Sequence, residues 1–185
     1  MIAHTIMSWD FSNGQHLAIS IETRKVVGQE YSAVGGFFRQ YPIYYVAADE
    51  RDVIGVRTNF RGENVWLYRL RPPAGGPRAL LLDYVASMNA LVETPQWYNA
   101  LVDNCTTSIR RHVRHLDPGR LPLDWRLLVN GYLDQMLYER GRIDTSLPFE
   151  KLRDESNIDA RAKAAGMGPE FSTRIREGLP DPRSR

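Results

Sequence analysis

AHTIMSWDFSNGQHLAISIET, residues 3–23, predicts a β-hairpin. Residues 4–9 and 16–23 are rich in apolar and β-branched side chains, which is typical of strands. Between them, Asn13 and Gly14 indicate a tight turn, because both residue types tolerate the positive φ that short hairpin loops require. His4 and Glu22 fall on opposite strands near the open end of this hairpin. We therefore expect the two side chains to be neighbours, whereas a one-residue shift of register would turn Glu22 to the other face.

The rest of the chain predicts a mixture of strands and helices. We expect strands at 43–47 and 64–70, helices at 49–60, 81–92, 104–116 and 124–141, and shorter helices within 31–40 and 148–165. These elements favour an α+β fold with a small antiparallel sheet packed against several helices. We expect residues 1–175 to form a single domain, and residues 176–185, which are polar and contain prolines, to form a disordered tail.

The composition limits the classes of function. The chain has 185 residues, and its 24 basic residues are nearly balanced by 22 acidic ones, which gives a net charge of +2. Such a balance argues against a nucleic-acid partner. No stretch approaches the roughly 20 apolar residues that a membrane span needs, and the first residues do not resemble a signal peptide. A histidine strand so close to the first residue would fray, so we expect a further segment upstream in the full gene product.

The cysteine and histidine content argues against a metal centre. A single cysteine cannot close an internal disulfide or build a cysteine-rich zinc site. His112 and His115 lie three residues apart on a predicted basic helix, and the sequence shows no acidic residue near them. We therefore expect neither a metal nor a cofactor.

The single cysteine, Cys105, is the strongest candidate for chemistry. It falls at the expected start of the helix at 104–116, where unpaired backbone N–H groups favour a thiolate. A histidine such as His4 could take the proton of this thiol, and Glu22 could orient the imidazole. The alternative is a small buried hydrophobe, because free cysteines are often buried and Cys105 shares an expected inward-facing stripe with Ile109, Val113 and Leu116.

Several short motifs together resemble one bacterial family. They are Ala3-His4-Thr5, Ser20-Ile21-Glu22-Thr23-Arg24, Asp49-Glu50-Arg51-Asp52, Arg57-Thr58-Asn59-Phe60-Arg61, Trp97-Tyr98, Asn104-Cys105-Thr106-Thr107 and Leu128-Val129-Asn130-Gly131-Tyr132. In this order they resemble the Lnb-type N-terminal periplasmic domain, formerly a domain of unknown function. The resemblance extends from about residue 3 to residue 175.

The resemblance implies a circularly permuted papain-like fold and a thiol-dependent acyltransferase or hydrolase. By position, Cys105 would be the nucleophile, His4 the general base and Glu22 the orienting group. The backbone N–H of Cys105, supported by Asn104, would form the oxyanion hole. The reaction would pass through a thioester acyl-enzyme, as in lipoprotein N-acylation or a related lipid acyl transfer. The implied location is the periplasm, close to a membrane surface, with a lipid or lipoprotein as acyl donor or acceptor.

Two further functions remain open at this stage. A cysteine peptidase or amidase acting on cell-wall peptides would use the same Cys–His pair on a peptide carbonyl. A non-catalytic binding module would instead use Arg51, Arg57 and Arg61 to hold an anionic envelope ligand. For these three arginines, ion pairs with neighbouring acidic residues are an equally good interpretation.

Overall fold

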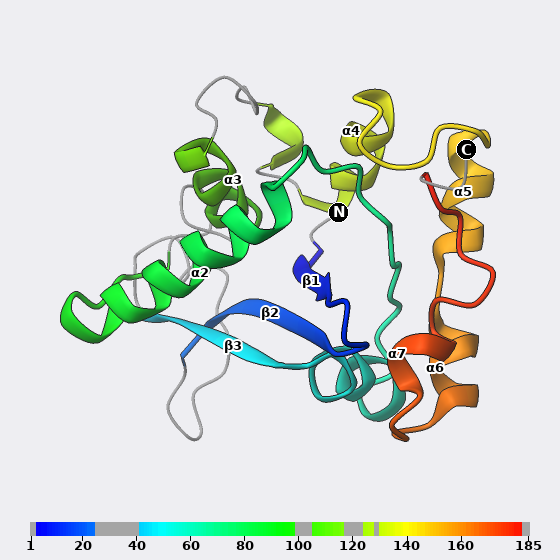
Figure 1. The fold of residues 1–185 in the computed structure, drawn as a ribbon, viewed down its shortest axis with the longest axis horizontal. Coiled ribbons are helices and arrows are strands. Elements are labelled where there is room, and N and C mark those ends of the chain that lie inside the picture. Colours follow the sequence, from blue (N-terminus) through cyan, green and yellow to red (C-terminus); the bar gives the residue numbers. More distant parts are fainter. Residues whose placement is uncertain (1–2, 25–40, 99–104, 117–123, 128–129, 183–185) are drawn as a thin grey trace. The chain divides into compact units, whose positions relative to one another are not determined.

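The fold is built on a three-stranded antiparallel sheet, shown in a computed structural model (Figure 1). The structure describes residues 3–24, 41–98, 105–116, 124–127 and 130–182. The strands are β1 (Ile6–Asp10), β2 (His16–Thr23) and β3 (Ile43–Asp49), in the spatial order β1-β2-β3. Because several helices accompany this sheet, the α+β prediction is confirmed. The helix expected within 31–40 lies outside the described residues.

The predicted hairpin forms around Asn13 and Gly14. Gly14 has φ +78°, a backbone conformation that residues other than glycine rarely adopt. Its N–H donates to the carbonyl of Phe11, and the N–H of Phe11 donates to the carbonyl of Gln15, at 3.0 Å each. The Asn13 side chain accepts a further hydrogen bond from the Gln15 N–H at 3.1 Å. The turn chemistry therefore sets the register that the sequence predicted.

The central strand, β2, is covered on both faces. Its four consecutive residues 18–21 are all buried, instead of alternating between buried and exposed. Alternation is expected only where one face of a sheet meets solvent, so β2 packs against other elements on both sides. This burial positions Ser20 and, one residue past the buried run, Glu22.

The described helical elements follow the sheet in sequence. They are η1 (Arg51–Phe60), α2 (Gly76–Glu93), α3 (Cys105–Leu116), η2 (Trp125–Leu127), η3 (Asn130–Tyr132), α4 (Leu133–Glu139), α5 (Phe149–Ser156), α6 (Asp159–Ala165) and α7 (Phe171–Arg174). Among the described residues, none of the helices is long and apolar enough to cross a membrane.

Two predicted elements differ from the structure. Residues 64–70 do not form a strand of the sheet; they run extended and form an isolated bridge between Trp66 and Asn157. The Leu67 N–H donates to Ser156 and the Ile158 N–H donates to Val65, so the partner of this segment is the α5–α6 connection. Within the helix expected at 124–141, the described residues form η2, η3 and α4 instead. The last of these ends at Glu139, just before Gly141, whose φ is +63°.

The helix expected at 49–60 is present as η1, but with π geometry. The Arg61 N–H donates to the Val56 carbonyl five residues earlier, at 3.0 Å. In this element Val53 and Thr58 are buried, whereas Phe60 is 73% exposed. Long π segments are rare and often mark functional regions.

The chain divides into two compact units. Unit 1 comprises residues 1–6, 20–46 and 73–133, and unit 2 comprises residues 7–19, 47–72 and 134–185. Each strand of the sheet contributes residues to both units. Unit 1 contains the open end of the hairpin together with α2 and α3.

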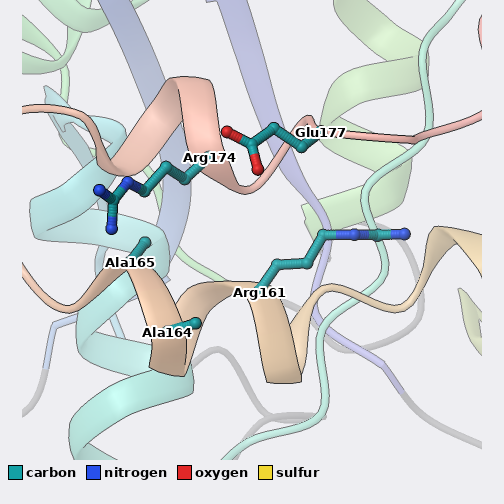
Figure 2. Close-up of a pocket in the computed structure, with 5 residues that line it drawn as sticks. All are labelled: Arg161, Ala164, Ala165, Arg174 and Glu177. Carbon is teal, nitrogen blue, oxygen red and sulfur yellow. The ribbon is translucent and has the colours of Figure 1, made fainter.

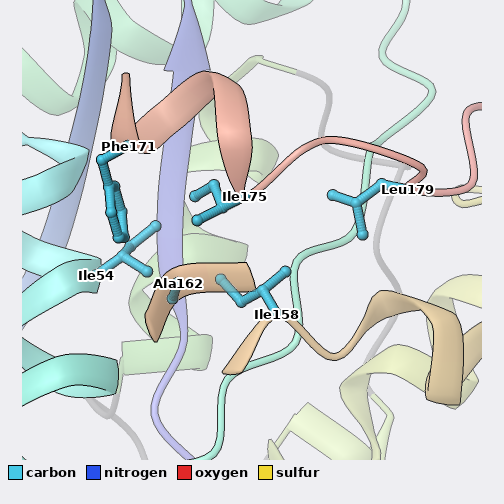
Figure 3. Packing of buried hydrophobic residues seen from close by; sticks show 6 residues of the cluster. All are labelled: Ile54, Ile158, Ala162, Phe171, Ile175 and Leu179. Atoms are coloured by element: carbon cyan, nitrogen blue, oxygen red, sulfur yellow. The ribbon is translucent and has the colours of Figure 1, made fainter. Parts of the chain in front are cut away.

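The hydrophobic core of unit 2 includes residues that we expected in the tail. Figure 3 shows this cluster, which consists of Ile54, Ile158, Ala162, Phe171, Ile175 and Leu179. Leu179 is only 7% exposed, and Asp181 forms an ion pair with Arg69. Residues 176–182 are therefore packed against η1 and α6 or paired with nearby residues, contrary to the expected disorder. Burial of the apolar Leu179 side chain favours the ordered state of this segment, although most of its residues are polar.

Candidate functional site

The predicted pairing of His4 and Glu22 is present in unit 1. Nε2 of His4 lies 2.6 Å from the Ser20 hydroxyl and 3.2 Å from the Glu22 carboxylate. Ser20 and Glu22 are two residues apart on β2, so both side chains project from the same face of the strand. The His4 and Glu22 side chains keep 29% and 26% of their surface exposed, whereas Ser20 is buried. The cluster is thus anchored on one side and open on the other.

The direction of these hydrogen bonds fixes the histidine tautomer. The Ser20 hydroxyl donates to Glu22 Oε1 at 2.5 Å, so its single proton is engaged there. The Ser20 oxygen can then only accept from His4, which places a proton on Nε2 of the imidazole. In the neutral ring the basic nitrogen is therefore Nδ1. Sequence analysis missed Ser20, although its position two residues before Glu22 on a strand was a usable signal.

The segment that contains His4 contacts the first turn of α3. The Thr5 and Thr106 hydroxyls form a hydrogen bond at 3.1 Å, and Thr106 is only 1% exposed. His4 precedes Thr5, and Cys105, the first residue of α3, precedes Thr106. Adjacent Cα atoms are about 3.8 Å apart, so the contact between the half-buried Thr5 hydroxyl and the buried Thr106 hydroxyl holds the backbones of both predicted catalytic positions in one region.

The remaining predicted groups at this helix end are only partly described. The backbone of Cys105 belongs to α3, whereas its side chain lies outside the described part of the structure. Asn104, the predicted support of the oxyanion hole, also lies outside the described residues. The start of α3 at Cys105 agrees with the predicted placement at a helix N-terminus, where the helix dipole favours an anion.

The buried face of α3 differs from the expected stripe. Ser108 and His112 are 1% and 0% exposed, whereas Leu116, which we expected to face inward, is 44% exposed. Ile109 and Val113 are half-buried. The inward side of this helix is therefore more polar than its apolar residues suggested, and His112 on that side binds polar groups of other elements.

His112 belongs to a polar cluster that sequence analysis missed. It consists of Asp83 from α2, His112 and His115 from α3, and Tyr45 from β3 (for α2 and α3, see Figure 1). Nδ1 of His112 lies 2.6 Å from Asp83 Oδ2, and its Nε2 lies 3.1 Å from the Tyr45 hydroxyl. The statement that no acidic residue lies near His112 and His115 is therefore wrong. Asp83 is distant in sequence, and only the packing of α2 on α3 brings it there.

Burial governs the titration of this cluster. Desolvation lowers the pKa of His112, and the Asp83 carboxylate opposes that shift. Desolvation also raises the pKa of Tyr45, while the nearby Arg111 cation opposes the shift. Both side chains are consequently held in their neutral forms near neutral pH.

The three predicted anion-binding arginines all have acidic neighbours. Arg57 binds Glu63 at 3.0 Å with 11% of its side chain exposed, and Arg61 approaches the same carboxylate at 3.5 Å. Arg51 lies 3.7 Å from Asp52. These contacts match the ion-pair interpretation of the arginines.

Unit 2 contains a buried ionic network centred on Glu50. Its carboxylate is 0% exposed and accepts hydrogen bonds from both terminal nitrogens of Arg176, at 2.6 Å each. Ser8 also donates to this carboxylate, and Asp10 binds Arg176 at 2.9 Å. His16 binds Asp10 at 2.7 Å. Glu50, which lies in the acidic start of the helix expected at 49–60, is thus a buried structural ion.

A shallow pocket of ≈ 320 Å³ lies in unit 2, apart from any predicted site residue (Figure 2). It is lined by Arg161, Ala164, Ala165, Arg174 and Glu177. Its two arginines and its glutamate make the wall charged, but no cysteine, serine, threonine or histidine is among the described residues that line it. The pocket therefore gives no support to a second catalytic centre.

Comparison with known proteins identifies a family. No curated protein and no solved structure is significantly similar to the chain. A family model, described as the Lnb N-terminal periplasmic domain, matches residues 1–131, which include His4, Ser20, Glu22, Thr106 and the start of α3. The chain therefore belongs to the Lnb N-terminal periplasmic domain family.

Proposed function

We propose that this chain is a thiol-dependent acyltransferase or hydrolase of the bacterial periplasm, with Cys105 as nucleophile and His4 as general base. The observation that supports it best is the oriented His4–Ser20–Glu22 cluster together with the Thr5–Thr106 contact at the first turn of α3. His4 lies just before β1, and a histidine at the first strand that precedes a cysteine helix is the order expected of a permuted papain-like enzyme. We therefore propose a circularly permuted papain-like fold for this chain.

In this mechanism, Nδ1 of His4 takes the proton of the Cys105 thiol, since Nε2–H is directed at Ser20 and Glu22. The thiolate sulfur attacks the carbonyl carbon of an ester or amide, and a C–S bond forms while the carbonyl oxygen becomes an oxyanion. The Cys105 backbone N–H, with Asn104 beside it, would stabilise that oxyanion. As the intermediate collapses, the C–O or C–N bond breaks and the leaving group takes the proton from His4.

The second half of the reaction releases the acyl group from the thioester. An amine, an alcohol or water gives its proton to His4 Nδ1 and attacks the carbonyl carbon, and the sulfur leaves as a thiolate that recovers the proton. Glu22 and Ser20 act as positioning residues, because they hold the imidazole by Nε2 and stabilise its cationic form.

The family's periplasmic description supports an acyl donor from the cell envelope. We propose a lipid or lipoprotein ester as donor and a lipoprotein amino terminus or a related amine as acceptor, at the membrane surface. A cell-wall peptidase would use the same residues on peptide bonds, and substrate choice distinguishes it. The binding-module alternative is less well supported, because Arg57 and Arg61 are engaged by Glu63.

Covalent labelling tests the proposal. The chain is incubated with an activated long-chain acyl ester, and acylation is read as an increase in intact mass. We expect labelling of the unmodified chain and its loss in Cys105→Ser and His4→Ala. His16→Ala is the matched control, since His16 lies on the same hairpin and also contacts a carboxylate, Asp10, at 2.7 Å.

Two results would decide against the proposed acyl-enzyme. One is labelling that survives His4→Ala; the other is labelling that is lost equally in His16→Ala. A short peptide ester and a long-chain ester used side by side then separate the peptidase from the lipid acyltransferase. A peptidase would prefer the peptide.

A further inference from the structure

A second cluster in unit 1 brings together the donor atoms of a zinc site. One oxygen of Asp83 and one nitrogen each of His112 and His115 lie within 4.8 Å of one another. His112 Nδ1 is 2.6 Å from Asp83 Oδ2, and His115 Nδ1 is 3.3 Å from either Asp83 oxygen. Two imidazoles and a carboxylate form a donor set that suits Zn²⁺ better than Mg²⁺ or Ca²⁺, which prefer oxygen.

The spacing is close to that of a tetrahedral ion. Zinc–nitrogen and zinc–oxygen bonds of about 2.0–2.2 Å place neighbouring ligand atoms roughly 3.3 Å apart. The distance from His115 to Asp83 already has this value. The distance from His112 to Asp83 is shorter by about 0.7 Å on the same basis, because a hydrogen bond donated by Nδ1 joins the two groups. For the ion to bind, the proton on Nδ1 would move to Nε2, which would then donate to the Tyr45 hydroxyl, and the Asp83 carboxylate would rotate slightly.

Two tyrosines fix the position of His112, the buried histidine of the cluster. The His112 side chain is 1% exposed and stacks on Tyr84, with ring centroids 3.9 Å apart. Its Nε2 is bound to the Tyr45 hydroxyl at 3.1 Å. A hydrogen bond to the second ring nitrogen is what orients a zinc-bound histidine and fixes its tautomer. His112 is therefore pre-oriented, with Nδ1 directed at Asp83.

The outer side of the cluster is open. The His115 side chain is 54% exposed, so its ring can adjust to an ion, and the Asp83 side chain is 20% exposed. Three protein ligands leave a fourth position for water or a small ligand. The local charge attracts a cation only weakly, because Asp83 is the one anion of the set and the Arg111 cation acts on both Tyr45 and His112.

The other histidine–carboxylate cluster among the described residues is less suited to a metal ion, because a cationic side chain already occupies it. It consists of Asp10, His16 and Glu50. Arg176 already neutralises it, through both Glu50 oxygens at 2.6 Å each and through Asp10 at 2.9 Å. A cation bound there would have to displace the guanidinium.

We propose that Asp83, His112 and His115 form a zinc-binding site that joins α2 to α3 and leaves one coordination position open. Because α3 begins at Cys105, the ion would also fix the helix on which the predicted nucleophile lies. The site does not depend on the acyl-transfer proposal, since its test measures metal and not acylation.

Zinc binding is measured by calorimetry and by metal content after gel filtration. The parent for these measurements is the full chain with Cys105→Ser, which removes the thiol as a competing ligand near His4. We expect one Zn²⁺ per chain and a Co²⁺ adduct with the strong visible absorption of four-coordinate cobalt. His115→Ala and Asp83→Asn should each weaken Zn²⁺ binding more than about tenfold, since loss of a mere supporting partner costs 10–100-fold.

His16→Ala is the matched control, because it removes a histidine from the other cluster and should leave Zn²⁺ binding unchanged. His115 is largely exposed and Asp83→Asn keeps the side-chain shape, so circular dichroism should show both variants folded. The proposal is overturned if the parent does not retain Zn²⁺, or if His115→Ala binds it as tightly as the parent does. A loss of binding in His16→Ala alone would assign the ion to the other cluster.

Discussion

Replacing Arg176 with methionine should destabilise the fold more than any change at a surface arginine. Glu50 is fully buried, and both of its oxygens accept hydrogen bonds from Arg176 at 2.6 Å. Methionine fills a similar volume but leaves the carboxylate with Ser8 as its remaining described donor and His16 at 3.8 Å. Removal of one partner from a buried ion pair costs about 3–5 kcal/mol, because an uncompensated charge stays in the interior.

This loss is a large fraction of the stability of an ordinary domain, which is about 5–15 kcal/mol. For a chain of this size, 1 kcal/mol shifts the melting temperature by about 2–4 °C, so we expect a decrease of about 6–20 °C. Urea unfolding followed by circular dichroism gives the free energy, and a thermal scan gives the shift.

Arg51→Met is the matched control. The Arg51 side chain is 34% exposed and lies 3.7 Å from Asp52, which is 60% exposed. Exposed pairs of this kind contribute about 0–1 kcal/mol. The double variant Glu50→Leu with Arg176→Met should regain much of the lost stability, since it removes the buried charge altogether. The reasoning is refuted if Arg176→Met is no more destabilising than Arg51→Met.

Three other changes test the active-site cluster and the core. Ser20→Ala should slow acylation about 10–100-fold, because a hydrogen bond to a charged partner contributes about 1.5–3 kcal/mol; an unchanged pH–rate profile with unchanged rate would exclude Ser20 as a positioning residue. Gly55→Ala places a Cβ 2.8 Å from Met167 Sδ and should cost about 1–3 kcal/mol in unfolding experiments, whereas Gly168→Ala, whose nearest contact is at 3.9 Å, should show no such overpacking. Leu179→Ala should lower the unfolding free energy by about 2–5 kcal/mol, and a loss below 1 kcal/mol would mean that the C-terminal segment does not pack.

The parts of the fold that could be predicted are those with local signals. Asn13 and Gly14 specify a turn by their own backbone preferences, and that turn fixes which residues of the hairpin face each other. The neighbours His4 and Glu22 follow from it. The start of α3 at Cys105 was predictable in the same way, from the change to helical spacing.

The parts that could not be predicted depend on partners far away in sequence. Residues 64–70 look like a strand, but their hydrogen bonds go to the α5–α6 connection, about 90 residues later. Glu50 looks like a solvated helix-start residue until Arg176 is brought to it from the other end of the chain. Asp83 is similarly unremarkable on its own helix, and only the contact between α2 and α3 makes it a neighbour of His112.

Each compact unit is assembled from three separate stretches of chain. A single proteolytic cut therefore cannot release either unit as one continuous fragment. Expression of residues 1–131 alone would omit Arg176 and leave Glu50 without its counter-ion, even though that piece spans the whole family match. The segment that the family model matches is thus shorter than the segment that holds both partners of the buried Glu50–Arg176 ion pair.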